Sequence, residues 1–487
     1  MAKILIIGGG VSGLSAGIYA RLHGHEAIVC ERHSIAGGNL TGWDRGDYHI
    51  DNCIHWLTGT NPVTSTYKMW EELDALGNVD VFQGDALYTS DIDGETLSLS
   101  RDLKKFESDM LALSPQDEKE IKSLIRAVKV IQGIEGIAGE NHDEKASVGQ
   151  ILCSIPTIMK YYKITTGELS ARFKHPLLSF FFSSFWGEDF GAFALIFVFA
   201  HFCGNNGGIP KGSSCAMAER MVKRLEKLGG ELLLKKEAVK INCIEGKAES
   251  VSFADGTTIE ADYVVLTGDP AVMFGNLLEA PMPKRLEKKY KNPRLKRFSS
   301  YQCAFTCDFD KLPFKGDFIF KLPKKLGELL GTKQLIVREF SHEVKFAPPG
   351  KNILQTLTFA YEESAKAFIK LKKLDKKAYQ EKKKELSEAI RGAIEKRFPQ
   401  LEGKLKCIDV WTPATYKRYV DTEIGSWMSF ALPSKMIPIR VGNGVDGLSN
   451  VILATQWQQS PGGLPIAAEG GRLAIKTILK KEKNKSR

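Results

Sequence analysis

The apolar and polar positions near the start of the chain predict a strand, a helix and a second strand in quick succession. Residues 3–10, KILIIGGG, form a short apolar run that ends in glycine, as expected for a strand buried on both faces. Residues 15–24 have the pattern of a helix, and residues 26–32 form the next apolar strand. A unit of this kind usually begins a parallel sheet that carries helices on its faces.

The pattern farther along the chain predicts a second region made of helices and an additional sheet. Two phenylalanine-rich runs, residues 176–186 and 190–202, predict a buried helix pair, a hydrophobic tunnel lined by the same rings, or both. Residues 376–398 predict an amphipathic helix that Pro399 stops. Strands of an antiparallel sheet are expected in four stretches, at residues 303–309, 317–322, 333–343 and 352–364.

The first glycines have the spacing of a dinucleotide-binding loop. Gly8 allows a tight turn, Gly10 lets the backbone approach a pyrophosphate, and Gly13 lets the helix pack closely on the strand. Glu31 stands at the end of the second strand, where a carboxylate can hold the ribose hydroxyls. Residues 442–447 also match the glycine pattern, but they precede a strand and no helix follows, so they predict a loop.

Composition and charge narrow the class of protein. The 487 residues, 43% hydrophobic and 26% charged, fit a folded protein of two interleaved domains. Nine scattered cysteines without a CxxC pair indicate neither a disulfide framework nor a zinc site, and they favour a reducing compartment.

The apolar segment 177–203 is interrupted and too short to span a bilayer. The net charge is +10, and most of the excess of basic residues lies in residues 284–297, 366–384 and 480–487. These segments are expected to form solvated faces or to attract anionic lipid headgroups.

The residues after the second strand resemble one superfamily of flavoproteins. Arg32 leads to a glycine pair, Gly37 and Gly38, and this arrangement is similar to the loop that runs along FAD in the flavin amine oxidase and phytoene desaturase superfamily. An arginine usually follows the glycines in that superfamily, and Asn39 takes its place here. Residues 51–59, DNCIHWLTG, resemble a stretch of retinol saturases and carotenoid isomerases, with a cysteine in place of the usual glycine.

Later segments extend the resemblance to the middle and the end of the chain. Residues 207–213 resemble the return to the FAD domain, after which the main chain around Val239 lies near the adenine in this family. Residues 450–479 resemble the segment that closes the FAD site, and residues 412–420 resemble the segment that comes before this final FAD motif. The expected cofactor-binding residues, from the motif and the resemblance together, are Gly8, Gly10, Gly13, Glu31, Arg32, Gly37, Gly38, Asn39, Val239, Gln456, Gly462, Gly463 and Leu464.

The resemblance implies an α/β fold in which a Rossmann-like FAD-binding domain is interleaved with an α+β substrate domain that carries an antiparallel sheet. The FAD-binding domain is expected to be discontinuous, over residues 1–75, 205–290 and 405–487. The substrate domain is expected over residues 76–204 and 291–404. FAD is the implied cofactor, and no metal site is indicated.

The resemblance also implies an FAD-dependent oxidoreductase that acts on C=C or C–C bonds of a lipophilic unsaturated substrate. As in phytoene desaturases, carotenoid isomerases and retinol saturases, such an enzyme would desaturate, saturate or isomerise its substrate through hydride transfer at flavin N5. His55 is the candidate catalytic residue, as a proton donor or as a group that orients a polyene, and a structural histidine bonded to backbone is the alternative. His201, on an apolar face, is interpreted as a satisfied core histidine.

Two other functions stay open. One is a flavin amine oxidase acting on a soluble amine, which would suit the aromatic residues Trp411, Tyr416, Trp427 and Trp457. The other is a flavoprotein that binds lipid without turnover. The expected partners are a lipophilic small molecule, an external electron acceptor or donor and, through the basic clusters, a membrane surface, but no nucleic acid. A cytoplasmic location is expected, with peripheral contact at the inner face of the membrane.

Overall fold

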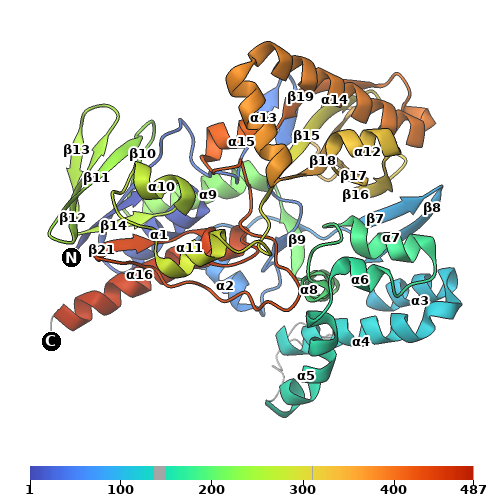
Figure 1. Cartoon of the computed structure of the whole chain (residues 1–487), viewed down its shortest axis with the longest axis horizontal. Coiled ribbons are helices and arrows are strands. Elements are labelled where there is room, and N and C mark those ends of the chain that lie inside the picture. Colours follow the sequence, from blue (N-terminus) through green and yellow to red (C-terminus); the bar gives the residue numbers. More distant parts are fainter. Residues whose placement is uncertain (136–147, 310, 486–487) are drawn as a thin grey trace.

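Two large sheets organise the computed structural model, one near the chain termini and the other on the opposite side of the molecule (Figure 1). The structure describes residues 1–135, 148–309 and 311–485, so the end of the basic cluster at 480–487 lies outside the described residues. Within these ranges, no helix combines the length and the apolar character needed to cross a bilayer.

The first sheet is the predicted Rossmann-like layer. Its strand order is β10-β2-β1-β14-β21-β20, and all neighbours run parallel except β20, which is antiparallel at one edge. The strands are β10 (Glu231–Leu233), β2 (Glu26–Cys30), β1 (Lys3–Ile7), β14 (Tyr263–Leu266), β21 (Leu448–Leu453) and β20 (Gly444–Val445). The predicted strand–helix–strand start is therefore confirmed, and the glycines at 442–447 open a hairpin between β20 and β21.

Alternating residues of β1 pack against opposite faces of this sheet. Ile4 and Ile6 pack under a layer of helices, while Leu5 packs toward a small antiparallel sheet on the other face. The helices are α1 (Val11–Leu22), α9 (Ser213–Lys227) and α16 (Leu464–Lys485). The opposite face carries β11 (Ala238–Ile244), β12 (Lys247–Phe253), β13 (Thr258–Glu260), α10 (Pro270–Asn276) and α11 (Lys284–Tyr290). The burial of β1 on both faces explains its apolar sequence.

The second sheet has the strand order β19-β15-β18-β17-β16-β7-β8. Its strands are β19 (Leu405–Trp411), β15 (Phe298–Cys307), β18 (Asn352–Tyr361), β17 (Gln334–Glu339), β16 (Asp317–Lys321), β7 (Ala86–Ile92) and β8 (Glu95–Ser100). The predicted antiparallel sheet is confirmed, with one parallel pair between β16 and β7. Because β19 pairs with β15, we propose to move the domain boundary predicted at residue 405 to residue 412.

Helices cover both faces of the second sheet. Ile336 and Leu357 pack against the helices around α7 and α8, whereas Val337 and Leu354 pack against α14, at the top of Figure 1. The helices are α3 (Leu103–Leu113), α4 (Glu118–Glu135), α5 (Val148–Tyr162), α6 (Thr166–Ser170), α7 (Pro176–Ser184), α8 (Ala192–Cys203), α12 (Lys324–Leu330), α13 (Glu362–Leu374) and α14 (Lys376–Arg397). The two phenylalanine-rich runs are thus confirmed as a helix pair, α7 and α8, that packs on the sheet.

Short elements connect the two halves of the fold. They are α2 (Ser65–Glu72), α15 (Pro413–Val420), the hairpin of β3 (Gly42–Arg45) and β4 (Tyr48–Asp51), and a small sheet of β5 (Leu57–Thr58), β9 (Gly207–Pro210) and β6 (Val81–Phe82). Both β5 and β9 carry segments that the sequence singles out, DNCIHWLTG and GGIPKGS, and they pair directly. These connections bring the early glycine loops next to the second sheet.

Candidate active site

A cavity of about 1650 Å³ extends from the end of the parallel sheet to the face of the second sheet. Ile7, Cys30 and Thr267 line it at the carboxyl ends of β1, β2 and β14, and Leu357 and Phe359 of β18 line it on the other side. A site for one small molecule usually measures about 300–1000 Å³. The cavity therefore has room for a dinucleotide together with a second molecule.

The first glycine loop forms the backbone wall of this cavity. Gly8 and Gly10 line it, while Gly13 lies behind them, where an added methyl group would come within 1.9 Å of the Gly8 carbonyl oxygen. The N-cap of α1, Gly10, has no side-chain cap, so the first N–H groups of the helix stay available to an anion. The close contact at Gly13 agrees with its predicted packing role, and the binding of a pyrophosphate at Gly8 and Gly10 stays a prediction.

The second glycine loop lies against the first. Gly10 and Gly37 form an isolated parallel bridge, and a methyl group at Gly38 would lie 3.2 Å from the Gly10 Cα atom. Both Gly37 and Gly38 line the cavity, as does the neighbouring Asn39. Two strips of main chain without side chains therefore meet at one wall, which suits close approach by a flat or phosphorylated ligand.

Glu31 is fixed where β2 ends. Its Oε2 atom accepts a hydrogen bond from the Gly9 N–H at 2.8 Å, and Oε1 accepts one from the His33 N–H at 2.9 Å. Glu31 is buried and still lines the cavity, so its carboxylate is held in place with lone pairs left for a ligand hydroxyl. The cavity also reaches Val239 on β11, whose side chain is 47% exposed.

Arg32 lines the cavity, but the end of α15 holds its guanidinium. Nη2 donates to the Arg418 carbonyl oxygen at 2.7 Å, and Nη1 lies 3.0 Å from the Asp421 carboxylate. A cofactor would therefore meet an arginine that is already paired. Its visible role is to attach the residue-421 loop to the end of β2.

Two amides converge on one backbone carbonyl at the far end of the cavity. The side chains of Asn39 and Gln456 both donate to the Trp427 carbonyl oxygen, at 3.1 Å and 3.3 Å. Gln456 Oε1 also accepts from the Gly463 N–H at 2.9 Å. The resemblance assigns both amides to cofactor binding, and Gln456 also fixes the glycine turn ahead of α16. Gly462, Gly463 and the first helical residue, Leu464, line the cavity beside them.

His55 lies between the cavity and a buried ion pair on the second sheet. Its Nδ1 atom is 3.8 Å from Asp317 Oδ2, and its side chain is 25% exposed and lines the cavity. Arg338 holds the same carboxylate with two hydrogen bonds, from Nε at 2.6 Å and from Nη2 at 2.8 Å. The imidazole therefore faces a carboxylate that Arg338 already holds, at a distance too long for a direct hydrogen bond.

Burial shifts the pKa values of both members of that ion pair. It raises the pKa of Asp317, with a further increase from the nearby Glu339 carboxylate. It lowers the pKa of Arg338 to about 9, so the guanidinium is still protonated at neutral pH. Because a protonated guanidinium donates two hydrogen bonds to the Asp317 carboxylate, we infer that both members of the pair are ionised. The neighbouring Asp51 carboxylate, which accepts from the Ser214 hydroxyl at 2.6 Å, adds negative charge to this side of the cavity.

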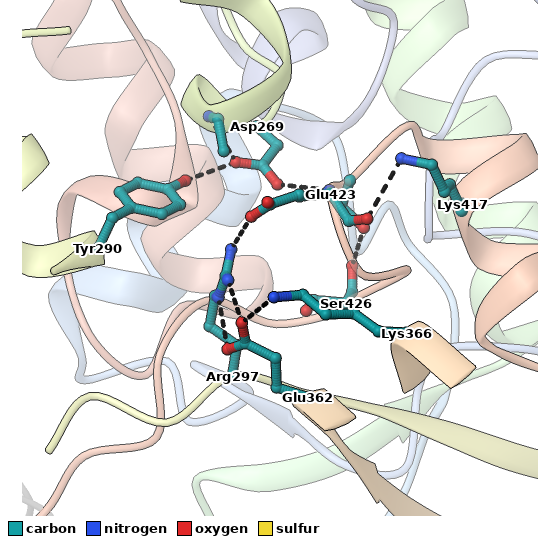
Figure 2. Close-up of polar contacts among 10 residues, drawn as sticks. Asp269, Tyr290, Arg297, Glu362, Lys366, Lys417, Glu423 and Ser426 are labelled. Atoms are coloured by element: carbon teal, nitrogen blue, oxygen red, sulfur yellow. Dashed lines mark hydrogen bonds and ion pairs between the residues drawn. The ribbon is translucent and has the colours of Figure 1, made fainter. Parts of the chain in front are cut away.

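Figure 2 shows a second charged network at the junction of the two sheets. Arg297, which precedes β15, donates to Glu362 at 2.6 Å and also pairs with Glu423. Asp269, which follows β14, accepts from the Glu423 N–H at 2.9 Å and from the Tyr290 hydroxyl at 2.5 Å. Asp269 and Glu423 line the cavity, so this network holds one of its walls in place. Burial raises the pKa of Asp269.

Comparison with known proteins identifies the family. A family model described as flavin containing amine oxidoreductase matches residues 11–382. The chain belongs to this family. As a flavin containing amine oxidoreductase it binds FAD and is an FAD-dependent oxidoreductase, which confirms the cofactor implied by the glycine loops.

Relatives of this flavin containing amine oxidoreductase agree with the predicted branch. The chain is 22% identical over 449 residues to chloroplastic prolycopene isomerase of Daucus carota, covering 87% of this chain and 71% of that one. It is 24% identical over 290 residues to phytoene desaturase (lycopene-forming) of Paracoccus sp., covering 56% of each. A solved oxidoreductase from Methanosarcina mazei, 16% identical, matches with a TM-score of 0.64 over 98% of this chain and 100% of that one, which shows the same fold.

The sequence did not single out several polar residues around the cavity. Asp317 and Arg338 come from neighbouring strands, and Asp269, Arg297 and Glu423 come from three separate segments. Each has an ordinary local sequence, and only the sheet pairing brings the partners together. A charged residue inside an otherwise apolar strand, as in the stretches DFIFKL and KQLIVREF, is the one local signal that could have pointed to the first pair.

Proposed function

We propose that this FAD-dependent oxidoreductase acts on C=C or C–C bonds of a lipophilic unsaturated substrate, as a desaturase, a saturase or an isomerase. The observation that carries the proposal is the cavity, because its glycine-walled end continues into an apolar end of the same space. The apolar end is lined by aromatic side chains of the α7–α8 region and of β18, namely Phe185, Trp186, Phe193, Phe197 and Phe359. The relatives named prolycopene isomerase and phytoene desaturase support the same substrate class.

The glycine-walled end would hold FAD. Gly8, Gly10 and the uncapped start of α1 would bind the pyrophosphate, and Glu31 would bind the ribose. The other predicted residues, Gly37 to Asn39, Val239 and Gly462 to Leu464, would shape the adenine and flavin ends of the site. When bound, FAD supplies the hydride chemistry, and the protein supplies position and a dry pocket.

His55 would move a proton at the reacting bond. Desaturation removes a hydride and a proton from the substrate, and saturation adds both, so a proton acceptor or donor is needed beside the flavin. His55 faces the cavity and its Nδ1 atom faces Asp317, which leaves Nε2 as the atom that would exchange the proton. Asp317, held in place by Arg338, would act through His55 by attracting the imidazole while it carries the transferred proton.

Product analysis tests this proposal. FAD-loaded protein would be incubated with micellar phytoene and prolycopene, with the flavin oxidised or pre-reduced, and the products separated by chromatography. More double bonds would indicate a desaturase, fewer a saturase, and a changed geometry without net redox an isomerase. Oxygen-dependent turnover of soluble amines alone would favour the amine oxidase alternative, and unchanged polyenes that nevertheless bind would favour a carrier.

A His55→Gln variant separates proton transfer from binding. It keeps a hydrogen-bonding side chain but cannot carry a proton at neutral pH, so turnover should fall by about 10²–10⁴-fold while FAD content stays the same. The matched control is His33→Gln, because His33 also lines the cavity and its imidazole bonds to the Tyr419 carbonyl oxygen near the surface. Equal activity of His55→Gln and wild type would remove His55 from the mechanism.

A further inference from the structure

His201 ends a row of side chains that faces the apolar part of the cavity. Phe193, Phe197 and His201 on α8 are spaced four residues apart, so they lie on one face of the helix, and all three line the cavity. The row spans roughly 12 Å at the usual rise of an α-helix. The rings of Phe197 and His201 are in contact, with 4.1 Å between their centroids. A long apolar ligand that follows the phenylalanines would therefore meet an imidazole at the end of the row.

The hydrogen bonds of Asn206 fix the tautomer of this imidazole. Asn206 Oδ1 accepts from two backbone N–H groups, those of Gly59 at 3.1 Å and Asn61 at 3.0 Å. This assigns the oxygen and the nitrogen of the amide, so Nδ2 is the donor toward His201 Nδ1 at 2.7 Å. Nδ1 is an acceptor, and in the neutral ring the hydrogen must then reside on Nε2.

The Nε2–H group of His201 has no hydrogen-bond partner among the described residues. The residue is only 3% exposed, and its side chain borders the cavity. Burial also lowers the pKa of His201 to about 4, which keeps the ring neutral at physiological pH. A buried donor without a partner is costly and uncommon in folded proteins, and a bound ligand is one way to satisfy it.

We propose that His201 Nε2–H donates a hydrogen bond to a hydroxyl or carbonyl oxygen of the substrate, so that the substrate is an oxygen-bearing unsaturated lipid and not a pure hydrocarbon. This inference rests on the proposed function and refines its substrate class. A neutral oxygen suits the site because the donor is neutral and its surroundings are aromatic, whereas a carboxylate would lose its hydration without meeting a charge there. The sequence interpretation of His201 as a fully satisfied core residue holds for Nδ1 alone.

Binding of matched polyenes tests the inference. FAD-loaded wild type would be titrated with micellar β-carotene, zeaxanthin and canthaxanthin, which share a skeleton and carry no oxygen, hydroxyl groups and keto groups respectively. Quenching of tryptophan fluorescence gives the dissociation constants. The wild type should bind the two oxygenated polyenes about tenfold more tightly than β-carotene, the size expected for one buried hydrogen bond.

Variants at His201 and at a neighbouring position complete the test. His201→Phe should bind all three polyenes equally, and His201→Gln, which keeps an N–H donor, should retain part of the preference. Phe193→Leu is the matched control, because it changes the same face of α8 without removing a donor and should weaken all three alike. The flavin absorbance of each variant reports whether it has folded and holds FAD.

The possible results distinguish this inference from the proposed function. Equal binding of the three polyenes by wild type, tighter binding of β-carotene, or a preference that survives in His201→Phe would overturn the role of His201 and leave the proposed function in place. Failure of wild type to bind any of the polyenes would overturn the proposed function, and the inference with it.

Discussion

Replacement of Gly13 by alanine perturbs the contact that sets helix α1 against strand β1. The added methyl group would lie 1.9 Å from the Gly8 carbonyl oxygen, where side-chain carbons essentially never come closer than 3.0 Å. Helix α1 would therefore have to move away from β1 by about 1 Å in a closely packed layer. The opposing atom is backbone, so no side chain can rotate to relieve the clash.

The movement would be resisted on the other side of α1 as well. The hydroxyls of Ser12 and Ser15 donate to the carbonyl oxygens of Ala467 and Ala468 on α16, at 3.0 Å and 2.6 Å. Overpacking of this kind costs about 1–3 kcal/mol, and it shifts the free N–H groups of α1 from their position at the cavity. Gly13→Ala should therefore unfold at lower urea concentration and bind FAD at least about tenfold more weakly.

Urea unfolding and the recovery of flavin fluorescence measure the two effects. Gly133→Ala is the matched control, because Gly133 lies in α4 and an added methyl group meets no atom within 4 Å. That variant should bind FAD normally and gain up to about 1 kcal/mol, since alanine favours a helix. If Gly13→Ala bound FAD as tightly as wild type and had unchanged stability, the assignment of this loop as the pyrophosphate site would be refuted.

Three further predictions concern charged or titratable groups. Asp317→Asn leaves the buried Arg338 without its partner and should lower the free energy of unfolding, measured in urea, by about 3–5 kcal/mol. The Asp317→Asn/Arg338→Met double variant should recover much of this loss. Equal losses of stability in the single and the double variant would contradict the ion pair. The pKa of His201 is lowered from 6.5 to about 4, so between these values the unfolded state binds more protons than the folded state, and stability should fall with falling pH by about 3 kcal/mol in total. His201→Gln should flatten that slope in unfolding measurements across the window, and an unchanged slope would count against the assignment. Arg297→Met removes charge-assisted hydrogen bonds to two carboxylates, so the free energy of unfolding should fall by about 1–3 kcal/mol and hydrogen exchange in residues 421–426 should become faster. Exchange at the wild-type rate in these residues would show that the network does not hold the loop.

The nucleotide end of the site could be predicted because its information is local. Gly8, Gly10, Gly13 and Glu31 lie within one strand–helix–strand unit, where glycine spacing and apolar runs determine the geometry. Four strands of the second sheet, β15 to β18, were likewise visible, since each is a short apolar run that is buried along most of its length. Strands β7 and β8 were not predicted. The placement of β19 was missed, because strand pairing across about a hundred residues leaves no mark in the local pattern.

The polar partners in the cavity could not be predicted from the sequence. His55 and Asp317 meet only after the chain has folded, and nothing near either member specifies the other. His201 and Asn206 are five residues apart, but the orientation of the Asn206 amide depends on the distant main chain of Gly59 and Asn61. Gln456 shows the same limit in another way. Its position at the cavity was expected, but its amide hydrogen bonds go to neighbouring main chain, a detail that depends on how two distant loops pack.

An anaerobic titration of the FAD-loaded protein tests the central claim most directly. Flavin absorbance would be followed as a micellar conjugated polyene is added, and in a parallel sample as a soluble diamine is added. We predict that the polyene perturbs or bleaches the flavin band in a saturable manner and that the diamine leaves it unchanged. Rapid bleaching by the diamine, with no response to any polyene, would contradict a lipophilic substrate and would identify the cavity as an amine site.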